Sequence, residues 1–398
     1  MAWAGAGVSL WQRIESQVRG SQSGAREAPV NLFNQIAVTG LPRETRLDLY
    51  SQFTREFGPD TNDFHLYALS MDVAKIAPWL GMTAGRQTVI RANVEGLMDG
   101  ASVRIAPGDH GLFFDLYGGF TRSVEMGDFR ARPGLLTGGQ VGWRPTADTS
   151  LAITSFYRRN DYQNRGWDTS ATQVLGLTGS HRFGTGRTAL VYVDATYDAA
   201  GKVLAAATVG GTWQATPRWM VSVSGNRYDT SRARTPTTIL SLFTDDDLWQ
   251  ARAGVRYTPN TTVSVFANYD WQQLEAGGRT EYGHVAEGGC DWDWKKQALG
   301  GTIRYRLLDS YGGRAHDFLM TTRYDPWKTI GLDQFTNITK YAKVTNETDT
   351  AVAAGLGVAY HPRDWIDLRT GGEYLSNNHF SNDWRFTGSL ALHWEKGT

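Results

Sequence analysis

Apolar and polar residues alternate with a period of two along most of this sequence, and the pattern is clearest near its end. In the stretch 382–394 every second position is apolar or glycine, with a tryptophan at each end: Trp384, Phe386, Gly388, Leu390, Leu392 and Trp394. The positions between them are Arg385, Thr387, Ser389, Ala391 and His393. Since successive side chains of a strand point to opposite faces, this stretch predicts a strand with one apolar and one largely polar face. Such a strand is typical of a membrane β-barrel, although a strand of a soluble sandwich alternates as well.

The same pattern recurs along the chain in segments of about ten residues or more, a length that suits a tilted crossing of a bilayer. Strands of soluble proteins average roughly half this length, so the length favours a membrane protein. The eighteen predicted strands are 45–56, 64–74, 79–89, 98–106, 111–121, 134–144, 149–158, 171–183, 187–198, 203–214, 217–228, 247–257, 261–272, 295–307, 315–325, 350–360, 365–375 and 382–394.

Short and long connections alternate between these predicted strands. The short ones, such as 144–145 and 361–363, contain the proline that is typical of tight turns. The long, polar ones include 122–133, 159–170, 229–246, 273–294 and 326–349. Short periplasmic turns and long extracellular loops are the rule for outer-membrane barrels. The sequence therefore predicts an all-β fold, a transmembrane antiparallel up-and-down β-barrel of about eighteen strands, with sixteen as the alternative, in a Gram-negative outer membrane.

The first residues are similar to the end of a secretory signal peptide. Ala2, Trp3 and Ala4 form an A-x-A cleavage site. We therefore interpret residues 1–4 as a signal-peptide remnant, with a chance alanine-rich start as the alternative.

Residues 5–44 are predicted to lie outside the barrel wall. Apolar residues from Val8 to Val18 have mostly helical spacing, which predicts a short N-terminal helix. Residues 30–38 alternate like a strand, but counting them gives nineteen strands, whereas single-chain bacterial barrels have even numbers. We therefore expect a short N-terminal periplasmic extension or plug at 5–44 and the transmembrane β-barrel at 45–398.

Composition narrows the classes of function. The charged fraction is 20%, the mean hydropathy is −0.40 and no run of eighteen apolar residues occurs, which excludes a helical membrane protein. The formal net charge is zero, so nucleic acid is not an expected partner. Because Cys290 is the single cysteine, the sequence predicts no disulfide framework, no haem attachment motif and no zinc cluster, and we expect no cofactor and no metal site.

If the apolar face of each strand contacts lipid, the charged residues of the other face line the lumen. Eighteen strands enclose a lumen too wide for side chains to close, so we expect an open or plugged pore. Five of the arginines would form a basic wall that attracts anions. These five are Arg252, Arg256, Arg304, Arg306 and Arg323. The alternative is that the charges pair across neighbouring strands. The predicted pore-lining residues are Arg104, Asp115, Asp194, Arg252, Arg256, Asp270, Arg304, Arg306, Asp317, Arg323, Asp367, Arg369, Glu373 and Arg385.

A catalytic site is not predicted. Ser389, His393 and Asp367 would face inward from neighbouring strands, and they are residue types that form hydrolase triads. The alternation requires polar residues at these positions in any such barrel, however, so we expect that the protein is not an enzyme.

Aromatic residues near the predicted long loops allow two interpretations. Trp292, Trp294, Tyr282 and Trp327 would stack on sugar rings at the mouth of a pore. Alternatively they belong to the aromatic girdles that mark the two membrane interfaces.

Two short segments resemble a known family. GRQ at Gly85 to Gln87, followed by LMDGASVRI from Leu97 to Ile105, is similar to an early hairpin of the alginate-export type of outer-membrane porin. This resemblance implies eighteen antiparallel strands, a lumen lined by arginine and acidic side chains, and passive movement of anionic or sugar-like solutes. The chain departs from the wider porin pattern after Trp394, because it does not finish on an aromatic residue.

The functional expectation is an outer-membrane, porin-like channel for passive passage of anionic or sugar-like solutes, or for export of a polymer. Its expected partners are outer-membrane lipid and a small or polymeric solute in the lumen. The alternative is a barrel that acts as a sheath or scaffold for a periplasmic protein partner. Such a partner would be a multihaem cytochrome, which would make an electron conduit, or a secretion lipoprotein.

Overall fold

The residues that the computed structural model describes lie almost entirely in β-strands. These residues are 7–20, 26–27, 29–56, 62–91, 94–108, 110–122, 134–159, 172–184, 186–229, 247–276, 278–310, 313–342, 348–377 and 383–396. In this part of the chain no helix is long and apolar enough to cross a membrane. Two 3₁₀ turns are η1 (Pro42–Glu44) and η3 (Lys295–Gln297). The strands are β1 (Gly7–Gly20), β2 (Arg26–Glu27), β3 (Pro29–Leu41), β4 (Thr45–Glu56), β5 (Asn62–Ala77), β6 (Leu80–Arg91), β7 (Val94–Ile105), β8 (Leu112–Arg122), β9 (Leu135–Thr146), β10 (Thr149–Arg159), β11 (Thr172–Phe183), β12 (Ala189–Asp198), β13 (Val203–Thr216), β14 (Trp219–Asp229), β15 (Asp247–Asn260), β16 (Val263–Ala276), β17 (Arg279–Trp294), β18 (Leu299–Ser310), β19 (Gly313–Trp327), β20 (Ile330–Ala342), β21 (Thr348–Arg363), β22 (Ile366–Ser376) and β23 (Asp383–Lys396).

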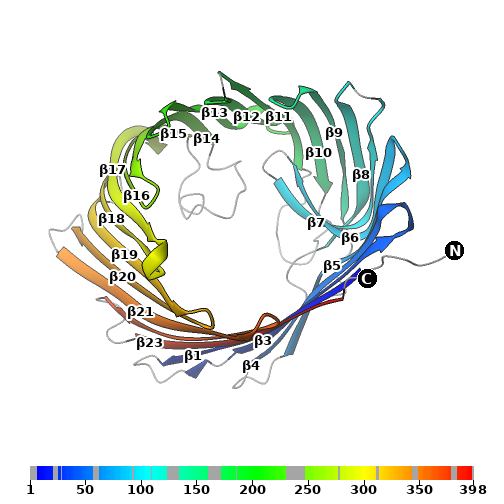
Figure 1. The fold of residues 1–398 in the computed structure, drawn as a ribbon. Coiled ribbons are helices and arrows are strands. Elements are labelled where there is room, and N and C mark those ends of the chain that lie inside the picture. The colour runs from blue at the N-terminus through cyan, green and yellow to red at the C-terminus, as the bar shows by residue number, and fades with distance from the viewer. Residues whose placement is uncertain are drawn as a thin grey trace.

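The strands form one closed cylinder (Figure 1). Each long strand is antiparallel to the long strands before and after it, and β1 also pairs with β23. Within the described residues the sheet has twenty-three strands, and leaving out the two-residue β2 gives twenty-two wall strands. The closing ladder runs from the pair Val8 and Lys396 to the pair Gly20 and Trp384. The expected all-β antiparallel barrel is therefore confirmed, whereas the expected count of about eighteen strands, or sixteen, is wrong.

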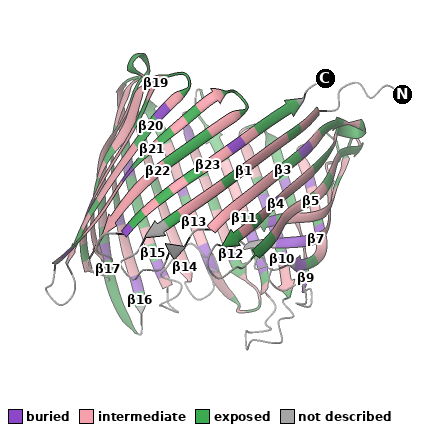
Figure 2. Cartoon of the chain, turned by 90° about the horizontal axis from the view of Figure 1, so that it is seen from below, coloured by how far each residue is buried: buried purple, intermediate pink, exposed green. Residues whose placement is uncertain are grey.

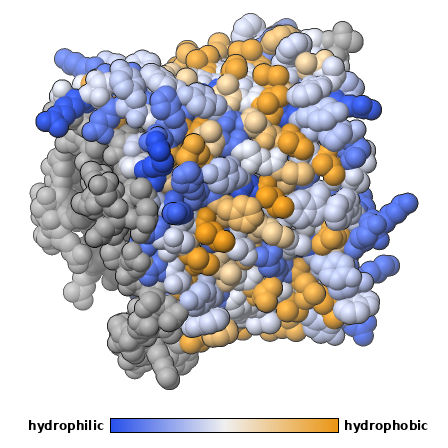
Figure 3. Space-filling model, turned by 90° about the vertical axis from the view of Figure 1, so that its left-hand side faces the viewer, coloured by the Kyte–Doolittle hydropathy of each residue, from blue (hydrophilic) through white to orange (hydrophobic). Residues whose placement is uncertain are grey.

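The two faces of the wall differ in character. Residues opposite each other across a ladder share a face of the sheet. The registers therefore show, for every strand, which side chains face outward and which face the lumen. On one face large apolar side chains are exposed, for example Leu356 at 71% and Ile153 at 59%. Apolar side chains are spread over the outer wall in Figure 3, and lipid is the medium that this surface requires. Exposed and buried residues alternate along β10 from Leu151 to Phe156. Figure 2 shows that most residues of the wall are intermediate or exposed, as expected for a hollow barrel.

Four of the wall strands are absent from the sequence prediction: β1, β3, β17 and β20. Strands β17 and β20 occupy much of the predicted loops 273–294 and 326–349. Outward positions of β17 include His284 and Gly288, and those of β20 include Gln334. Because these outward faces are partly polar or small, their alternation lacks the apolar residues that reveal the other strands.

The N-terminal region belongs to the wall. Residues 7–20 and 29–41 are β1 and β3, so the expected helix, periplasmic extension and plug are wrong for these residues. In β1, Ile14 and Val18 share the outward face, and Trp11 lies on the inner face. Residues four positions apart share a face on a strand as well as on a helix. This explains why the sequence predicts a helix where the structure has a strand. Even parity holds, since eighteen predicted strands plus four missed ones give twenty-two.

The barrel has a terminal end, where the described chain termini lie side by side, and an opposite loop end (Figure 2). The turn between β19 and β20 lies at the terminal end, so the long loop predicted after Asp325 on the outer side is wrong. The predicted loops 122–133, 159–170 and 229–246 fall largely outside the described residues. The interpretation of residues 1–4 as a signal-peptide remnant also concerns residues outside the described part.

Placing a charge on the lipid face of β1 tests whether this strand belongs to the wall. Ile14→Arg puts a guanidinium into the apolar belt and should lower the free energy of unfolding by about 2–4 kcal/mol. Gln17→Arg changes the inner face of the same strand and should have an effect within about 0.5 kcal/mol. Urea denaturation of the protein folded in lipid vesicles measures both. Equal effects of the two substitutions would contradict the assignment.

Candidate functional site: the barrel lumen

All fourteen predicted pore-lining residues lie on the face of the wall opposite to the exposed apolar one. The registers connect this inner face from strand to strand, as in the opposed residues Arg252 and Asp270. Glu373 and Arg385 are likewise opposite each other on β22 and β23. Their role in conduction stays a prediction.

The five arginines expected to form a basic wall are each paired with a carboxylate. Their closest contacts range from 2.5 Å between Arg252 and Asp270 to 3.9 Å between Arg304 and Glu287. The pairs are Arg252 with Asp270, Arg256 with Asp291, Arg304 with Glu287, Arg306 with Asp317, and Arg323 with Asp325. One carboxylate balances each arginine, so local pairing of charges describes this surface better than net positive charge does. We call these ten residues the ion-pair wall.

Two acidic members of the ion-pair wall, Glu287 and Asp291, escape sequence reasoning because they lie on β17, which is predicted as a loop. Asp291 accepts hydrogen bonds from Arg256 at 2.7 Å and from Thr302 at 2.9 Å, so it connects β15, β17 and β18. A usable signal is present in the sequence. Acidic residues recur at every second or fourth position from Glu287 to Asp293, as the inner face of a strand requires.

The other predicted residues are spread around the inner wall, and most of them belong to local ion pairs. These pairs are Arg104 with Asp115 at 3.8 Å, Arg369 with Asp367 at 2.8 Å, and Arg385 with Asp383 at 4.0 Å. Asp194 lies on β12 opposite Thr208 of β13. The structure thus distributes the predicted residues as pairs around the cylinder and does not gather them into one site.

The residues of the suspected triad are not arranged for catalysis. Ser389 and His393 are four residues apart on β23, which separates them by about 13 Å along an extended strand. Arg369 donates to both carboxylate oxygens of Asp367, at 2.8 to 3.1 Å. In the described part of the chain, no group of three or more His, Cys, Asp and Glu side chains is placed to hold a metal ion.

The aromatic residues of β17 lie on its outward face. Tyr282 is 59% exposed and Trp294 is 43% exposed on the same side as the other lipid-facing residues, and Trp292 shares this parity. Trp327 is the last residue of β19, at the terminal end, and is 64% exposed. These positions agree with interface girdles and not with stacking inside the lumen.

Beyond Arg86 and Asp99 the hairpin of β6 and β7 turns away from β5 and folds into the lumen (Figure 1), while β7 stays paired with β8. Pairing of β5 with β6 stops at Leu69 and Arg86, although β6 continues for five more residues. The bend lies at three glycines that are neighbours across the strands: Gly85 pairs with Gly100, and Gly100 pairs with Gly119. A Cβ atom on Gly100 would lie only 2.6 Å from the Cα of Gly119, and Gly85 has a φ of 116°. Only glycine permits this close approach and this backbone conformation. We call these three residues the glycine row.

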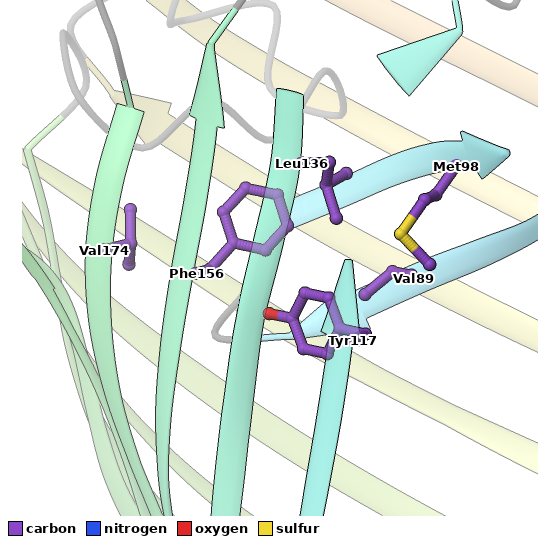
Figure 4. Packing of buried hydrophobic residues seen from close by; sticks show 6 residues of the cluster. All are labelled: Val89, Met98, Tyr117, Leu136, Phe156 and Val174. Carbon is purple, nitrogen blue, oxygen red and sulfur yellow. The ribbon is translucent and has the colours of Figure 1, made fainter. Parts of the chain in front are cut away.

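The folded hairpin packs against the inner face of β8, β9, β10 and β11. Its contact is an apolar cluster formed by Val89, Met98, Tyr117, Leu136, Phe156 and Val174 (Figure 4). Met98, Leu136 and Phe156 have no exposed surface. The Tyr117 hydroxyl donates to the carbonyl of Ser155 at 3.0 Å, which satisfies its polar atom. Burial of each large apolar side chain stabilises by about 1.5–3 kcal/mol, so the hairpin is firmly attached inside the barrel.

An ion pair lies where β6 separates from β5. Arg86 donates to both carboxylate oxygens of Asp99 at 2.6 and 2.7 Å. Its third contact is a hydrogen bond of 3.2 Å to the backbone carbonyl of Leu66, beyond the last pair of the β5 and β6 ladder. The Arg86 side chain is only 12% exposed. The guanidinium therefore supplies a donor to β5 at a point where the backbone of β6 has moved away.

These residues are the ones that carry the family resemblance. Gly85 and Arg86 belong to GRQ, whereas Asp99 and Gly100 belong to LMDGASVRI. The two segments pair as Gly85 with Gly100 and as Arg86 with Asp99. The glycines form the bend and the charges fill the break beside it, which gives the motif a physical reason. Alternation identified both strands of the hairpin but contains no signal for its inward fold.

A thiol-labelling experiment tests the packing of the hairpin. In a Cys290→Ser background, Met98→Cys should react slowly with a maleimide, because Met98 is fully buried. Adding Gly100→Val should speed its labelling, since a side chain at this position collides with the backbone of β8. Ile90→Cys, at an exposed position of the same hairpin, should react fast in both backgrounds. Fast labelling of Met98→Cys without the glycine substitution would contradict the packed hairpin.

Comparison with known proteins concerns the fold. No family model and no curated protein matches the sequence. Among solved structures, the translocation pore of the P pilus usher PapC aligns with a TM-score of 0.53 and 9% identity, covering 97% of this chain and 99% of that chain. OpdO of Pseudomonas aeruginosa aligns with a TM-score of 0.50 and 11% identity, covering 98% and 97%. The eighteen-stranded alginate-export architecture implied by the motif is not found, since the wall has twenty-two strands. The chain thus shares with these proteins the fold of a closed antiparallel β-barrel of the bacterial outer membrane.

Proposed function

We propose that this protein is a passive outer-membrane channel for polar, hydroxyl-rich or anionic solutes. The observation that carries the proposal is the hairpin of β6 and β7 inside the lumen. A barrel of this strand number encloses a space that side chains alone do not fill. An inward hairpin fixed by buried apolar contacts narrows that space, as a channel for small solutes requires.

The ion-pair wall supports passage of polar solutes. Its guanidinium groups and carboxylates present closely spaced donors and acceptors that replace hydration of a solute near the wall. Because the charges balance pairwise, the expected preference among ions is weak, and salt screens it further in a wide pore. Hydroxyl-rich solutes gain from such a surface without needing a net charge.

The other roles predicted from the sequence receive less support. Export of a polymer needs a wider path than a small solute does, and a sheath for a multihaem cytochrome or a secretion lipoprotein needs room for a protein inside the barrel. The hairpin takes up part of that room. We therefore place the solute channel first, and we propose no enzymatic activity.

Shortening the hairpin tests its proposed role as a constriction. Arg86 and Asp99 are ladder partners, so an Asn-Gly turn in place of residues 87–98 can join them directly. We expect a larger single-channel conductance and faster sugar uptake in liposome swelling. Leu356→Ala, on the lipid face, serves as the control with unchanged conductance. A shortened variant that inserts normally and conducts like the parent protein would disprove the constriction.

Breaking and restoring one ion pair tests the charge balance of the wall. Arg252→Gln leaves Asp270 unpaired and should shift selectivity toward cations, because an uncompensated carboxylate then faces the lumen. Adding Asp270→Asn should return the reversal potential in a salt gradient to the parent value. If Arg252→Gln alone causes no shift, these charges do not line the conducting path.

A further inference from the structure

A pocket of about 370 Å³ lies on the inner wall at the seam where β1 meets β23. Its lining comes from β23, β1, β3 and β4, and the proposed channel function does not by itself explain it. Ser9 of β1 and Glu395 of β23 are ladder partners near the two chain termini, so the pocket lies close to the terminal end. Its volume is at the lower end of the range for small-molecule sites, roughly 300–1,000 Å³.

Two short side chains create the hollow. Ser9 lies between Glu395 and Ala37 in one row across the strands, and Ala37 is buried in the floor. In the next row Trp11 lies opposite His393. Longer side chains thus surround a depression over Ser9 and Ala37, with an indole and an imidazole along one edge.

The indole provides a flat apolar surface inside an otherwise polar lumen. The rings of Trp11 and His393 are 6.2 Å apart and meet edge to face at 63°, which supports the orientation of the indole. Trp11 faces the lumen, whereas outward residues such as Ile14 and Val18 make the lipid contacts of β1. An aromatic face beside water-filled space suits the C–H face of a sugar ring.

Hydrogen-bonding groups stand on the other sides of the hollow. Glu395 lies on β23, Gln35 on β3, and Arg46 on β4 at the far side. Arg46 donates two hydrogen bonds of 2.7 Å to Asp48, which fix the guanidinium in place. A carboxylate, an amide and a guanidinium together offer the donors and acceptors that neighbouring hydroxyls need. Because the carboxylates of Glu395 and Asp48 outnumber the guanidinium of Arg46, this group of charges gives no advantage to an anionic ligand.

Aromatic and amide groups continue from the pocket along the wall. Tyr50 is the ladder partner of Gln35 and stacks on Tyr67, with ring centroids 5.1 Å apart. The Tyr67 hydroxyl donates to the side-chain oxygen of Gln52 at 2.8 Å. In Figure 1 the strands of the pocket lie along the bottom of the barrel, and those of the ion-pair wall lie along its left side. A solute with several rings would find similar chemistry on leaving the pocket.

We propose that this pocket binds one ring of a neutral saccharide. Trp11 stacks on the ring, while Gln35, Glu395 and Arg46 bond its hydroxyls. The inference rests on the proposed channel function and names neutral saccharides as its solute class. It also assigns the terminal end of the barrel as the place where a sugar pauses during passage.

Blockade of single channels by maltohexaose tests the pocket in the full-length protein. Sugar bound in the lumen interrupts the ionic current, and the titration gives an apparent affinity. Trp11→Ala should weaken this affinity roughly tenfold, because the stacking surface is lost, and Trp11→Phe should retain most of it. Ala37→Leu should also weaken it, because the new side chain fills the hollow. Trp384→Ala removes an outward tryptophan from β23 and should change nothing.

The outcomes separate the pocket from the channel. Normal conductance without sugar blockade, or equal blockade in the parent protein and in Trp11→Ala, would overturn the saccharide pocket and leave the channel intact. Absence of conductance in the parent protein would overturn the proposed function itself. Insertion of each variant is checked by its electrophoretic shift on heating, and if Trp11→Ala does not assemble, Ala37→Leu decides the question.

Discussion

Backbone hydrogen bonding in lipid is the constraint on which this structure depends. No water is present in the core of a bilayer, so each strand needs a partner on both sides and the sheet has to close. The ladder of thirteen pairs between β1 and β23 provides this closure. The N-terminal segment is therefore part of the wall for the same reason as the C-terminal strand, and the strand number is even because both described termini lie at one end.

The break between β5 and β6 is the place where the wall departs from this rule. Beyond Arg86 the hairpin gives up its pairing with β5 and gains burial against β8 to β11, with which it forms the apolar cluster of six side chains. Part of the lost pairing is replaced by Arg86, whose guanidinium bonds the carbonyl of Leu66 while Asp99 neutralises its charge. The glycine row makes this exchange sterically feasible, because side chains at Gly100 and Gly119 would collide. Bend, ion pair and apolar cluster thus act as one device.

The sequence predicts the class of fold because period-two alternation follows directly from the geometry of strands. The alternation also predicts which residues face the lumen. A charged residue such as Arg252 has to point to the side of the strand opposite to its two neighbours in the chain. Alternation fails where the outward face loses apolar residues, as at His284 and Gln334, and where a spacing of four fits both helix and strand, as at Ile14 and Val18. It contains no information on pairing partners. The neutralisation of Arg256 by Asp291 and the gathering of Val89 and Phe156 in one apolar cluster depend on an arrangement that only the folded barrel defines.

Charge pairing also determines how such a lumen can discriminate between solutes. A field from unpaired arginines would extend about 8 Å into physiological salt, whereas a paired guanidinium and carboxylate act mainly through contact. Contact requires that the solute come close to the wall. A barrel of twenty-two strands is so wide that a small solute can pass without touching it. The inward hairpin narrows the lumen beside β8 to β11, and short residues such as Ser9 and Ala37 leave room for a ring at the seam. Selection in this barrel therefore has to come from the shape and hydrogen-bonding pattern of its inner surface, and a long-range field adds little.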